Sequence, residues 1–249
     1  MQKILSLMRH AIDKYNLIQD GDKIAVGISG GKDSLILAKA LKQYSKFSKE
    51  KFSIVGITID MFNKGPNQDL VNFCKNEEIE YYVIPSNIYE TVFEIRKEKN
   101  PCSLCSKLRR GILVTTAKEL GCNKLALGHT ADDVIHTFFL SMIYEGRLSS
   151  FAPYSYLDRT NMYVIRPLIL TDEKWILKEA KNVPVEKSKC PMDKTSKREE
   201  IKKLIENLEK EIPISKDRIF RAITSPESYN LFDKFENDIF TINNQDKNK

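Results

Sequence analysis

The sequence predicts an α/β protein with a parallel, twisted sheet and helices on both of its faces. Short runs rich in Val and Ile alternate with longer segments of helical periodicity, and this alternation is typical of parallel sheets. No apolar run approaches the roughly 20 residues that span a bilayer. With 249 residues and 41% hydrophobic content, the chain can bury a full core. We therefore expect a cytoplasmic protein that does not bind membranes.

The expected elements follow one another in a regular order. The N-terminus is predicted to be an amphipathic helix, because it lacks the continuous apolar stretch and cleavage site of a signal peptide. Beyond Pro167 the pattern becomes helical, and the apolar positions of 196–212 indicate packing on the domain, with a membrane-surface helix as the alternative. We expect strands at 23–28, 52–60, 80–85 and 124–129, and helices at 1–15, 35–44, 68–76, 104–120, 131–144, 172–181, 196–212 and 225–238.

The stretch VGISGGKDS, which begins at Val26, joins a predicted strand to a predicted helix. Two adjacent glycines permit a sharp turn and a close approach of the main chain to a ligand. Amides at the following helix N-terminus attract phosphate, although a tight turn without a ligand is the alternative. The Walker pattern is excluded because Val26 and Asp33 stand where it needs a glycine and a hydroxyl residue, and the glycine spacing does not fit the Rossmann pattern.

The six residues from Ser29 to Ser34 resemble, without a gap, the signature of the N-type ATP pyrophosphatases, also called PP-loop enzymes. In that family the loop grips pyrophosphate while ATP adenylates a carbonyl oxygen. The residue types suit this chemistry: Lys32 can neutralise charge on the leaving pyrophosphate, and a Mg²⁺ ion would explain Asp33, which is unusual in a phosphate loop. The ATP-binding residues that the resemblance implies are Gly27, Ile28, Ser29, Gly30, Gly31, Lys32, Asp33, Ser34, Thr58, Ile59, Gly128, His129 and Asp133.

Two aspartates follow the predicted strand that ends in GHTADD. The resemblance places one or both beside the nucleotide, so Asp132 is a candidate base or Mg²⁺ ligand. The alternative for both residues is a carboxylate at a helix N-terminus, which stabilises the helix by up to about 1 kcal/mol. For Asp133 the two interpretations are equally open.

Five cysteines do not suggest a disulfide framework. Cys102 and Cys105 form a CxxC pair, which fits two buried cysteines, a redox dithiol or half of a zinc site. A four-cysteine zinc site would need a second pair, which is absent from the sequence. Cys190 lies in a polar stretch, and three cysteines can bind a [4Fe–4S] cluster and leave one iron open. Cys74 and Cys122 lie in apolar patterns and are expected in the core.

Three further stretches, PCSLCSKLRRGIL, LGHTADDVIHTFFLSMIYEGRLSSFAP and VIRPLI, resemble the tRNA 2-thiocytidine synthetase family over roughly residues 23–198. The resemblance implies that Cys102, Cys105 and Cys190 bind a [4Fe–4S] cluster and that sulfur replaces a base oxygen after its adenylation. It also places Arg109 where related enzymes carry a basic active-site residue. The context of Cys190, KCPMD, lacks a second cysteine pair, and the zinc ribbons of the 2-thiouridine branch are absent. These departures concern the substrate.

The chain has a net charge of +6, and several of its basic residues lie close in sequence to the CxxC pair. A basic mouth of the site suits a tRNA backbone and would make affinity fall with salt; a solvated basic face is the alternative. Phe151, Tyr154 and Tyr156, expected in a loop, could stack an unpaired base or cover the sheet edge. The basic residues that surround the pair are Arg96, Lys97, Lys99, Lys107, Arg109 and Arg110.

Together these features predict an ATP-dependent tRNA sulfurtransferase that makes 2-thiocytidine, with Asp33, Asp132 and Arg109 as catalytic residues. ATP, Mg²⁺ and a [4Fe–4S] cluster are the expected cofactors. The expected partners are tRNA, a sulfur donor (a cysteine desulfurase or sulfide) and, in a homodimer, a second copy. Alternatives are another acceptor (2-thiouridine, lysidine or a small molecule) and a non-catalytic RNA-binding or redox-sensing relative. We expect an N-terminal helix at 1–20, the PP-loop domain at 21–212 and a helical tail at 213–249.

Overall fold

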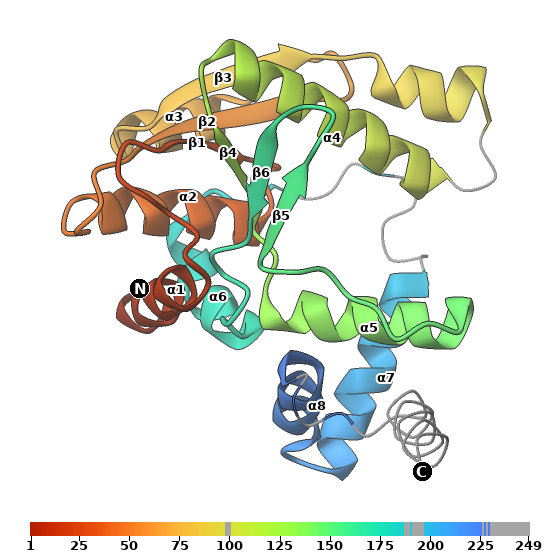
Figure 1. The fold of residues 1–249 in the computed structure, drawn as a ribbon. Helices are drawn as coiled ribbons and strands as arrows, with labels where there is room; N and C mark the ends of the chain where they lie inside the picture. Colours follow the sequence, from red (N-terminus) through yellow and green to blue (C-terminus); the bar gives the residue numbers. More distant parts are fainter. Residues whose placement is uncertain (98–100, 187–189, 191–196, 226, 228, 230–249) are drawn as a thin grey trace, which may run out of the picture.

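The computed structural model describes residues 1–97, 101–186, 190, 197–225, 227 and 229 (Figure 1). Among these residues one sheet has six strands in the order β3–β2–β1–β4–β6–β5, and only the β5–β6 pair is antiparallel. The predicted α/β architecture with a largely parallel sheet is confirmed. The strands are β1 (Lys23–Gly27), β2 (Ser53–Asp60), β3 (Glu80–Pro85), β4 (Lys124–Ala126), β5 (Tyr154–Leu157) and β6 (Met162–Ile165).

Helices cover both faces of the sheet. A short π-helix, η1 (Glu90–Ile95), precedes α4. A short 3₁₀-helix, η2 (Ala180–Asn182), follows α6. The helix predicted at 225–238 lies almost wholly outside the described residues. The α-helices are α1 (Gln2–Tyr15), α2 (Lys32–Ser45), α3 (Gln68–Asn76), α4 (Pro101–Glu119), α5 (Ala131–Glu145), α6 (Glu173–Glu179), α7 (Lys197–Glu211) and α8 (Ser215–Thr224).

The alternation of side chains along β1 separates two cores. Ile24 and Val26 point to the face covered by α1, α2 and α3, whereas Ala25 points to the face covered by α4 and η1. Both faces are buried, which explains why the central strands are apolar without polar alternation. A third cluster forms where Ile135 of α5 packs against Ile201 and Ile205 of α7.

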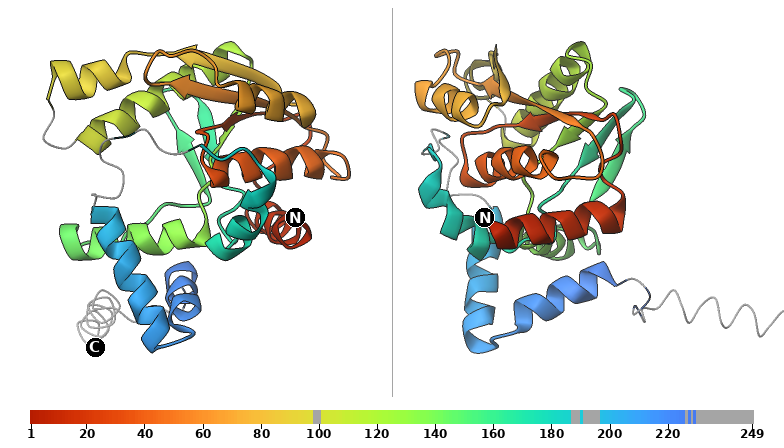
Figure 2. Two further views of the ribbon diagram at one scale, coloured as in Figure 1. Left: turned by 180° about the vertical axis from the view of Figure 1, so that it is seen from behind. Right: turned by 90° about the vertical axis from the view of Figure 1, so that its left-hand side faces the viewer.

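The helical extension packs on α5 rather than on the sheet. Figures 1 and 2 show α7 and α8 on the side of α5 that faces away from the strands. The apolar stripe predicted for 196–212 therefore packs on the domain, as Ile201 and Ile205 show. Within the part of the chain that the structure describes, no helix has the length and apolar character needed to cross a bilayer.

The region of residues 151–166 differs from the prediction. Tyr154 and Tyr156 do not lie in a loop: they belong to β5, which pairs with β6 at the edge of the sheet. Tyr154 stacks on Tyr163 with ring centroids 4.9 Å apart, and the tilted Tyr156 ring contacts Tyr163 at 4.7 Å. These tyrosines cover the sheet edge, which favours the second of the two predicted roles, while Phe151 lies before β5 and contacts His129.

The strand order reverses between β1 and β4. In open α/β sheets, ligands bind beyond the carboxyl ends of the strands at such a point. The phosphate-loop residues follow β1, and the GHTADD residues follow β4. The topology thus brings two stretches separated by about a hundred residues to the same edge of the sheet.

Candidate active site

A cavity of about 730 Å³ opens at this edge of the sheet. It is lined by the phosphate loop, the end of β2, the residues after β4, the first turns of α4 and the segment that contains Cys190. Ile28, Gly30, Lys32 and Asp132, all predicted site residues, are not among its lining residues. Of the predicted residues it brings together Gly27, Ser29, Gly31, Asp33, Ser34, Thr58, Ile59, Cys102, Cys105, Arg109, Gly128, His129, Asp133 and Cys190.

The phosphate loop is braced by its own serines. The Ser34 hydroxyl donates to the Gly31 carbonyl at 2.9 Å and accepts from the Ser29 amide at 3.0 Å. Ser34 therefore shapes the loop, whereas Ser29 is closer to the surface. Gly31 caps α2 without a side-chain hydrogen bond, so the amides at the start of α2 are available to an anion.

Glu186, which sequence reasoning missed, packs on this loop. Its amide donates to the Gly30 carbonyl at 2.9 Å. Gly30 has φ +79°, and a Cβ there would lie 2.5 Å from the Glu186 carboxylate. The left-handed backbone of Gly30 favours glycine, and a larger residue would also displace the Glu186 carboxylate. The contact anchors Glu186 on the phosphate loop.

Asp33 has the features of a cation ligand. Its Oδ1 is buried and has no hydrogen-bond partner among the described residues, while Oδ2 accepts from Lys32 at 3.0 Å. Burial raises the pKa of Asp33, although the charge of Lys32 opposes this. A buried carboxylate oxygen without a partner is costly, and Mg²⁺ at this oxygen would supply the missing interaction.

Lys32 is held beside the cavity rather than in its wall. Its ammonium lies 2.7 Å from the Glu173 carboxylate at the start of α6. Burial alone would lower the pKa of Lys32, but the charges of Asp33 and Glu173 raise it. Glu173 also pairs with Lys202 of α7 at 3.3 Å. A basic residue of the loop is thereby linked to the helical extension.

Two loops touch where β4 ends. A Cβ on Gly128 would lie 2.9 Å from the backbone of Asp33, so only glycine lets the residues after β4 approach the phosphate loop this closely. Nearby, the Thr58 hydroxyl donates to the Ile28 carbonyl at 2.7 Å and ties the ends of β2 and β1 together. Thr58 and Ile59 line the cavity, consistent with their predicted place beside a nucleotide.

The two aspartates after β4 have different surroundings. Asp132 is buried, forms an ion pair with Lys216 of α8 and accepts from the Glu173 amide at 2.6 Å. Its carboxylate therefore joins α5, α6 and α8, and the structure does not bring it to the cavity. Asp133 lines the cavity, but it also caps α5 through Thr130 and pairs with Arg198 at 3.1 Å. Asp133 thus has the helix-terminus role, and its predicted place beside the nucleotide stays a prediction.

The three predicted cluster ligands form a cysteine wall of the same cavity. Cys102 and Cys105 occupy the first turns of α4, and Cys190 lines the same cavity from the segment after η2. Burial raises the pKa of the Cys105 thiol, against the charge of Arg109, and Cys190 and Cys102 raise it further. Among the described residues, no three or more His, Cys, Asp or Glu side chains are arranged closely enough to hold a metal ion. Donor type and location fit an iron–sulfur cluster.

Cys74 and Cys122 are buried in the core, as predicted. Cys74 packs in the cluster on the α2 and α3 face and Cys122 in the cluster on the α4 face. Burial raises the pKa of the Cys74 thiol to about 12. Neither residue lines the cavity.

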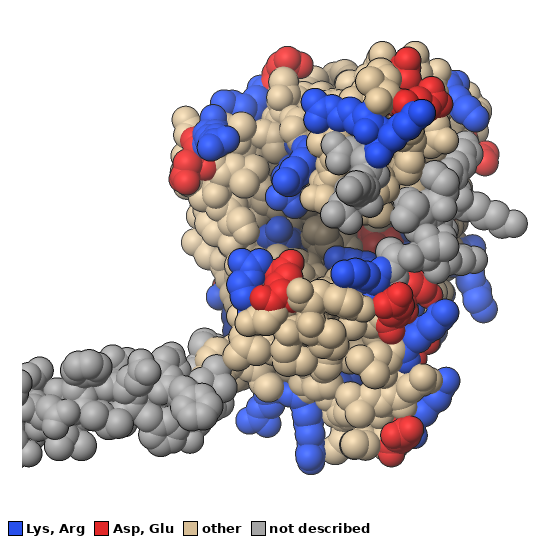
Figure 3. All heavy atoms as spheres, turned by 90° about the vertical axis from the view of Figure 1, so that its right-hand side faces the viewer, with Lys and Arg blue, Asp and Glu red and all other residues tan. Residues whose placement is uncertain are grey.

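Basic side chains border the cysteine wall. Arg109 and Arg110 of α4 and Arg198 of α7 line the cavity, whereas Lys107 does not. Burial lowers the pKa of Arg109, and Cys105 partly offsets this. Figure 3 shows Lys and Arg side chains around a hollow on this side of the molecule. The arginines therefore face the interior of the site and Lys107 its surroundings.

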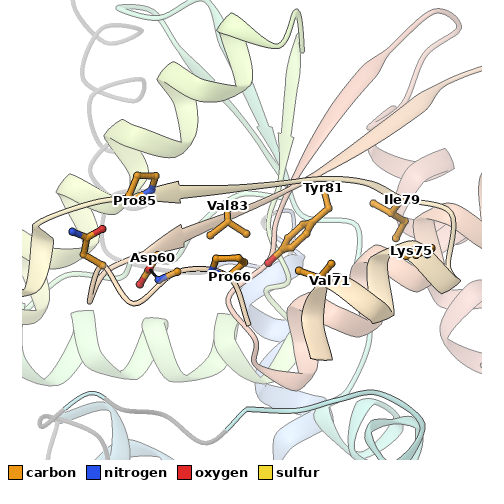
Figure 4. A pocket seen from close by; sticks show the side chains of 10 residues that line it. Asp60, Pro66, Val71, Lys75, Ile79, Tyr81, Val83 and Pro85 are labelled. Atoms are coloured by element: carbon orange, nitrogen blue, oxygen red, sulfur yellow. Dashed lines mark hydrogen bonds between the residues drawn. The ribbon is translucent and has the colours of Figure 1, made fainter. Parts of the chain in front are cut away.

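A second cavity of about 640 Å³ lies along β3 and α3 (Figure 4). Its wall is largely apolar, with Tyr81 and Val83 of β3 facing Val71 of α3. Asp60 and Gly65 line this cavity and the larger one, so the two are neighbours. The Asp60 carboxylate accepts from the amides of Phe62 and Gly65 and shapes the loop between β2 and α3.

Comparison with known proteins gives concordant results. The model of the PP-loop domain family matches residues 2–206. The tRNA-cytidine(32) 2-sulfurtransferase of Geobacter sulfurreducens is 35% identical over 238 residues, which cover 93% of each chain. The chain belongs to the tRNA-cytidine(32) 2-sulfurtransferase family of PP-loop proteins.

Two further similarities agree with this family. The tRNA-cytidine(32) 2-sulfurtransferase of Ralstonia pickettii is 35% identical over 246 residues, 97% of this chain and 77% of its own length. The solved structure of the U34-tRNA thiolase NcsA from Methanococcus maripaludis with its [4Fe-4S] cluster superimposes with a TM-score of 0.69 and 28% identity. That match covers 90% of this chain and 79% of the thiolase. PP-loop family membership and the fold resemblance predicted from the sequence are confirmed.

Proposed function

We propose that this protein uses ATP to replace the C2 oxygen of a cytidine in tRNA by sulfur. The observation that carries the proposal is the shared cavity: residues of the phosphate loop and three cysteines line it together. ATP chemistry alone would not require the cysteines, and a redox dithiol would not require the loop. The names of its relatives point to cytidine 32 as the substrate position.

The phosphate loop binds ATP and Mg²⁺, whereas Arg109 and the cysteines serve the sulfur transfer. The amides before α2 bind the pyrophosphate part of ATP, and Asp33 binds Mg²⁺ through its buried Oδ1. Adenylation of the base oxygen makes that oxygen a leaving group, and AMP and pyrophosphate are the products from ATP. Arg109 stabilises negative charge beside the cysteines.

Cys102, Cys105 and Cys190 would hold a [4Fe–4S] cluster, whose open iron would bind the sulfide that replaces the base oxygen. That sulfide would come from free sulfide, or from a cysteine desulfurase whose persulfide sulfur a thiol reductant brings to the sulfide level. The enzyme works in the cytoplasm, where its tRNA is found. Homodimer formation is a separate proposal, which light scattering of the purified protein tests.

The basic wall supports tRNA as the substrate over a small molecule. Arg110 and Arg198 line the cavity, and Lys107 continues the positive surface along α4. Lysidine synthesis is a weaker alternative because it leaves the cysteine wall unexplained. Nucleoside analysis of tRNA from a deletion strain tests the proposal: 2-thiocytidine should be lost and return with the intact gene, whereas unchanged thiolation rules this function out in the cell.

A further inference from the structure

A buried arginine orients the histidine of the cavity. Arg166 follows β6 directly and is 6% exposed. Its Nε–H donates to Nδ1 of His129 at 3.3 Å, and Nη1 donates to the Ala152 carbonyl at 2.6 Å and to the Ser155 hydroxyl at 3.2 Å. The guanidinium also lies over the Phe151 ring, 4.9 Å from its centroid. No ion pair with Arg166 occurs among the described residues.

The direction of this hydrogen bond fixes the tautomer of His129. A guanidinium can only donate, so Nδ1 of His129 accepts and the ring proton resides on Nε2. The Phe151 ring, 4.7 Å from the imidazole centroid, packs on both His129 and Arg166. The imidazole is therefore held from one side while the rest of the ring lines the cavity.

The charges around His129 favour the neutral ring. Among the described residues, Arg110 of α4, Arg166 after β6 and Arg198 of α7 act against protonation, and Asp133 of α5 acts for it. Burial, the largest effect, lowers the pKa of His129 to about 4. A histidine with these neighbours carries no positive charge at neutral pH.

His129 lines the same cavity as the phosphate loop and the cysteines. It follows Gly128, which touches the backbone of Asp33, and it shares the cavity with Cys102 and Cys105. We propose that Arg166 is a positioning residue that holds His129 as a neutral Nε2–H donor to an oxygen of the substrate base. His129 then acts as a fixed hydrogen-bond donor and transfers no proton. This inference deepens the proposed function and rests on it for the identity of the acceptor.

The tautomer can be measured without any activity. The chain has three histidines, so ¹⁵N-histidine labelling gives a simple spectrum in which His129→Gln assigns the signal. We expect His129 to carry its proton on Nε2 and to stay neutral from pH 5.5 to 8.5. In Arg166→Gln both tautomers should appear and the pKa of His129 should rise. Unchanged signals of His10 and buried His136 show that the variant is folded, and Arg166→Met, which removes the donor and keeps much of the side-chain length, replaces it if they shift.

A pair of substitutions separates donation from proton transfer. The amide nitrogen of Gln can take the place of Nε2, whereas that of Asn lies near Nδ1. His129→Gln should therefore keep tRNA thiolation within about 10-fold, while His129→Asn and Arg166→Gln lose about 10- to 100-fold, the scale for a residue that orients an imidazole. Equal loss in His129→Gln and His129→Asn, or a wild-type ring protonated at pH 6.5 or on Nδ1, overturns the inference. Absence of thiolation in the wild type with the expected tautomer would instead refute the proposed function.

Discussion

The ammonium of Lys32, in the phosphate loop, lies 2.7 Å from a carboxylate oxygen of Glu173, the first residue of α6. Lys32 also pairs with Asp33, and although burial lowers its pKa, the charges of Asp33 and Glu173 together hold that pKa above the usual value. Pyrophosphate must therefore compete with a carboxylate for this lysine. The pair is partly exposed, with side-chain exposures of 22% and 18%, which keeps its contribution small.

Removal of that competitor should strengthen ATP binding. We expect Glu173→Gln to lower the Kd of a non-hydrolysable ATP analogue about two- to fivefold, the equivalent of a partly exposed ion pair. Lys32→Gln should raise the Kd instead. Lys202→Gln is the matched control, because it removes the other partner of Glu173 and leaves the Lys32 pair in place. Calorimetric titration measures all three, and weaker binding in Glu173→Gln would mean that Glu173 positions Lys32 for phosphate.

Asp33 should lower stability in exchange for function. Burial raises its pKa in the folded protein, so the folded state holds the proton more tightly than the unfolded chain. The cost of ionising Asp33 is absent below the unfolded pKa of about 3.9 and complete above the folded pKa. Asp33→Asn should therefore raise the Tm at pH 7 and leave it unchanged near pH 3.

Scanning calorimetry without ATP or Mg²⁺ measures this difference. The same variant should lose ATP turnover and keep its iron, because Asp33 belongs to the phosphate loop and the cysteines belong to other segments of the chain. A lower Tm than that of the wild type at pH 7 would show that the pair with Lys32 outweighs the burial of the carboxylate.

The cysteines make a prediction about metal content. Protein purified without oxygen should contain about four irons per chain. Cys102→Ser, Cys105→Ser and Cys190→Ser should each lose most of this iron. Cys74→Ser is the control, since Cys74 is buried on the other side of the sheet. Iron and zinc analysis decides the matter, and stoichiometric zinc without iron contradicts the cluster.

Arg109 and Lys107 provide a matched test of the basic wall. Both belong to α4, but only Arg109 lines the cavity, one turn beyond Cys105. Arg109→Ala should keep iron and ATP binding and reduce thiolation by about 100-fold or more, the effect of removing a transition-state donor. Lys107→Ala should weaken tRNA binding modestly and reduce its salt dependence. Equal defects that low salt rescues in both variants would leave Arg109 with a binding role only.

Local patterns predicted the parts of the molecule that depend on local interactions. The helix at 68–76 begins and ends as expected, since Asn67 caps it through the Asp69 amide. The phosphate loop and both cysteines of the CxxC pair lie in the cavity as expected. Each of these features is encoded within a few neighbouring residues.

The features that sequence reasoning missed join distant segments. Arg166 and His129 are 37 residues apart in the sequence, and Glu173 and Lys32 are farther apart still. Tertiary folding brings each pair together, and local sequence patterns contain no information about it. Asp132 was predicted in the site because it is adjacent in sequence to Asp133, which lines the cavity. The Asp132 side chain instead pairs with Lys216. The β5–β6 hairpin was missed because its strands are short. The sequence did contain one indication of the turn, Asn161. This residue has φ 48° in the structure, a conformation that asparagine adopts more readily than most residues.

The most direct test of the central claim is thiolation by the purified protein. Anaerobic enzyme with its iron, unmodified tRNA, Mg-ATP and sulfide should produce 2-thiocytidine, detected by mass spectrometry as an oxygen-to-sulfur exchange, together with AMP and pyrophosphate. Asp33→Ala and Cys190→Ser should each abolish the product for separate reasons, the first without iron loss and the second with it. Formation of ADP, or turnover of ATP with tRNA that gains no sulfur in a pyrimidine, would contradict the account.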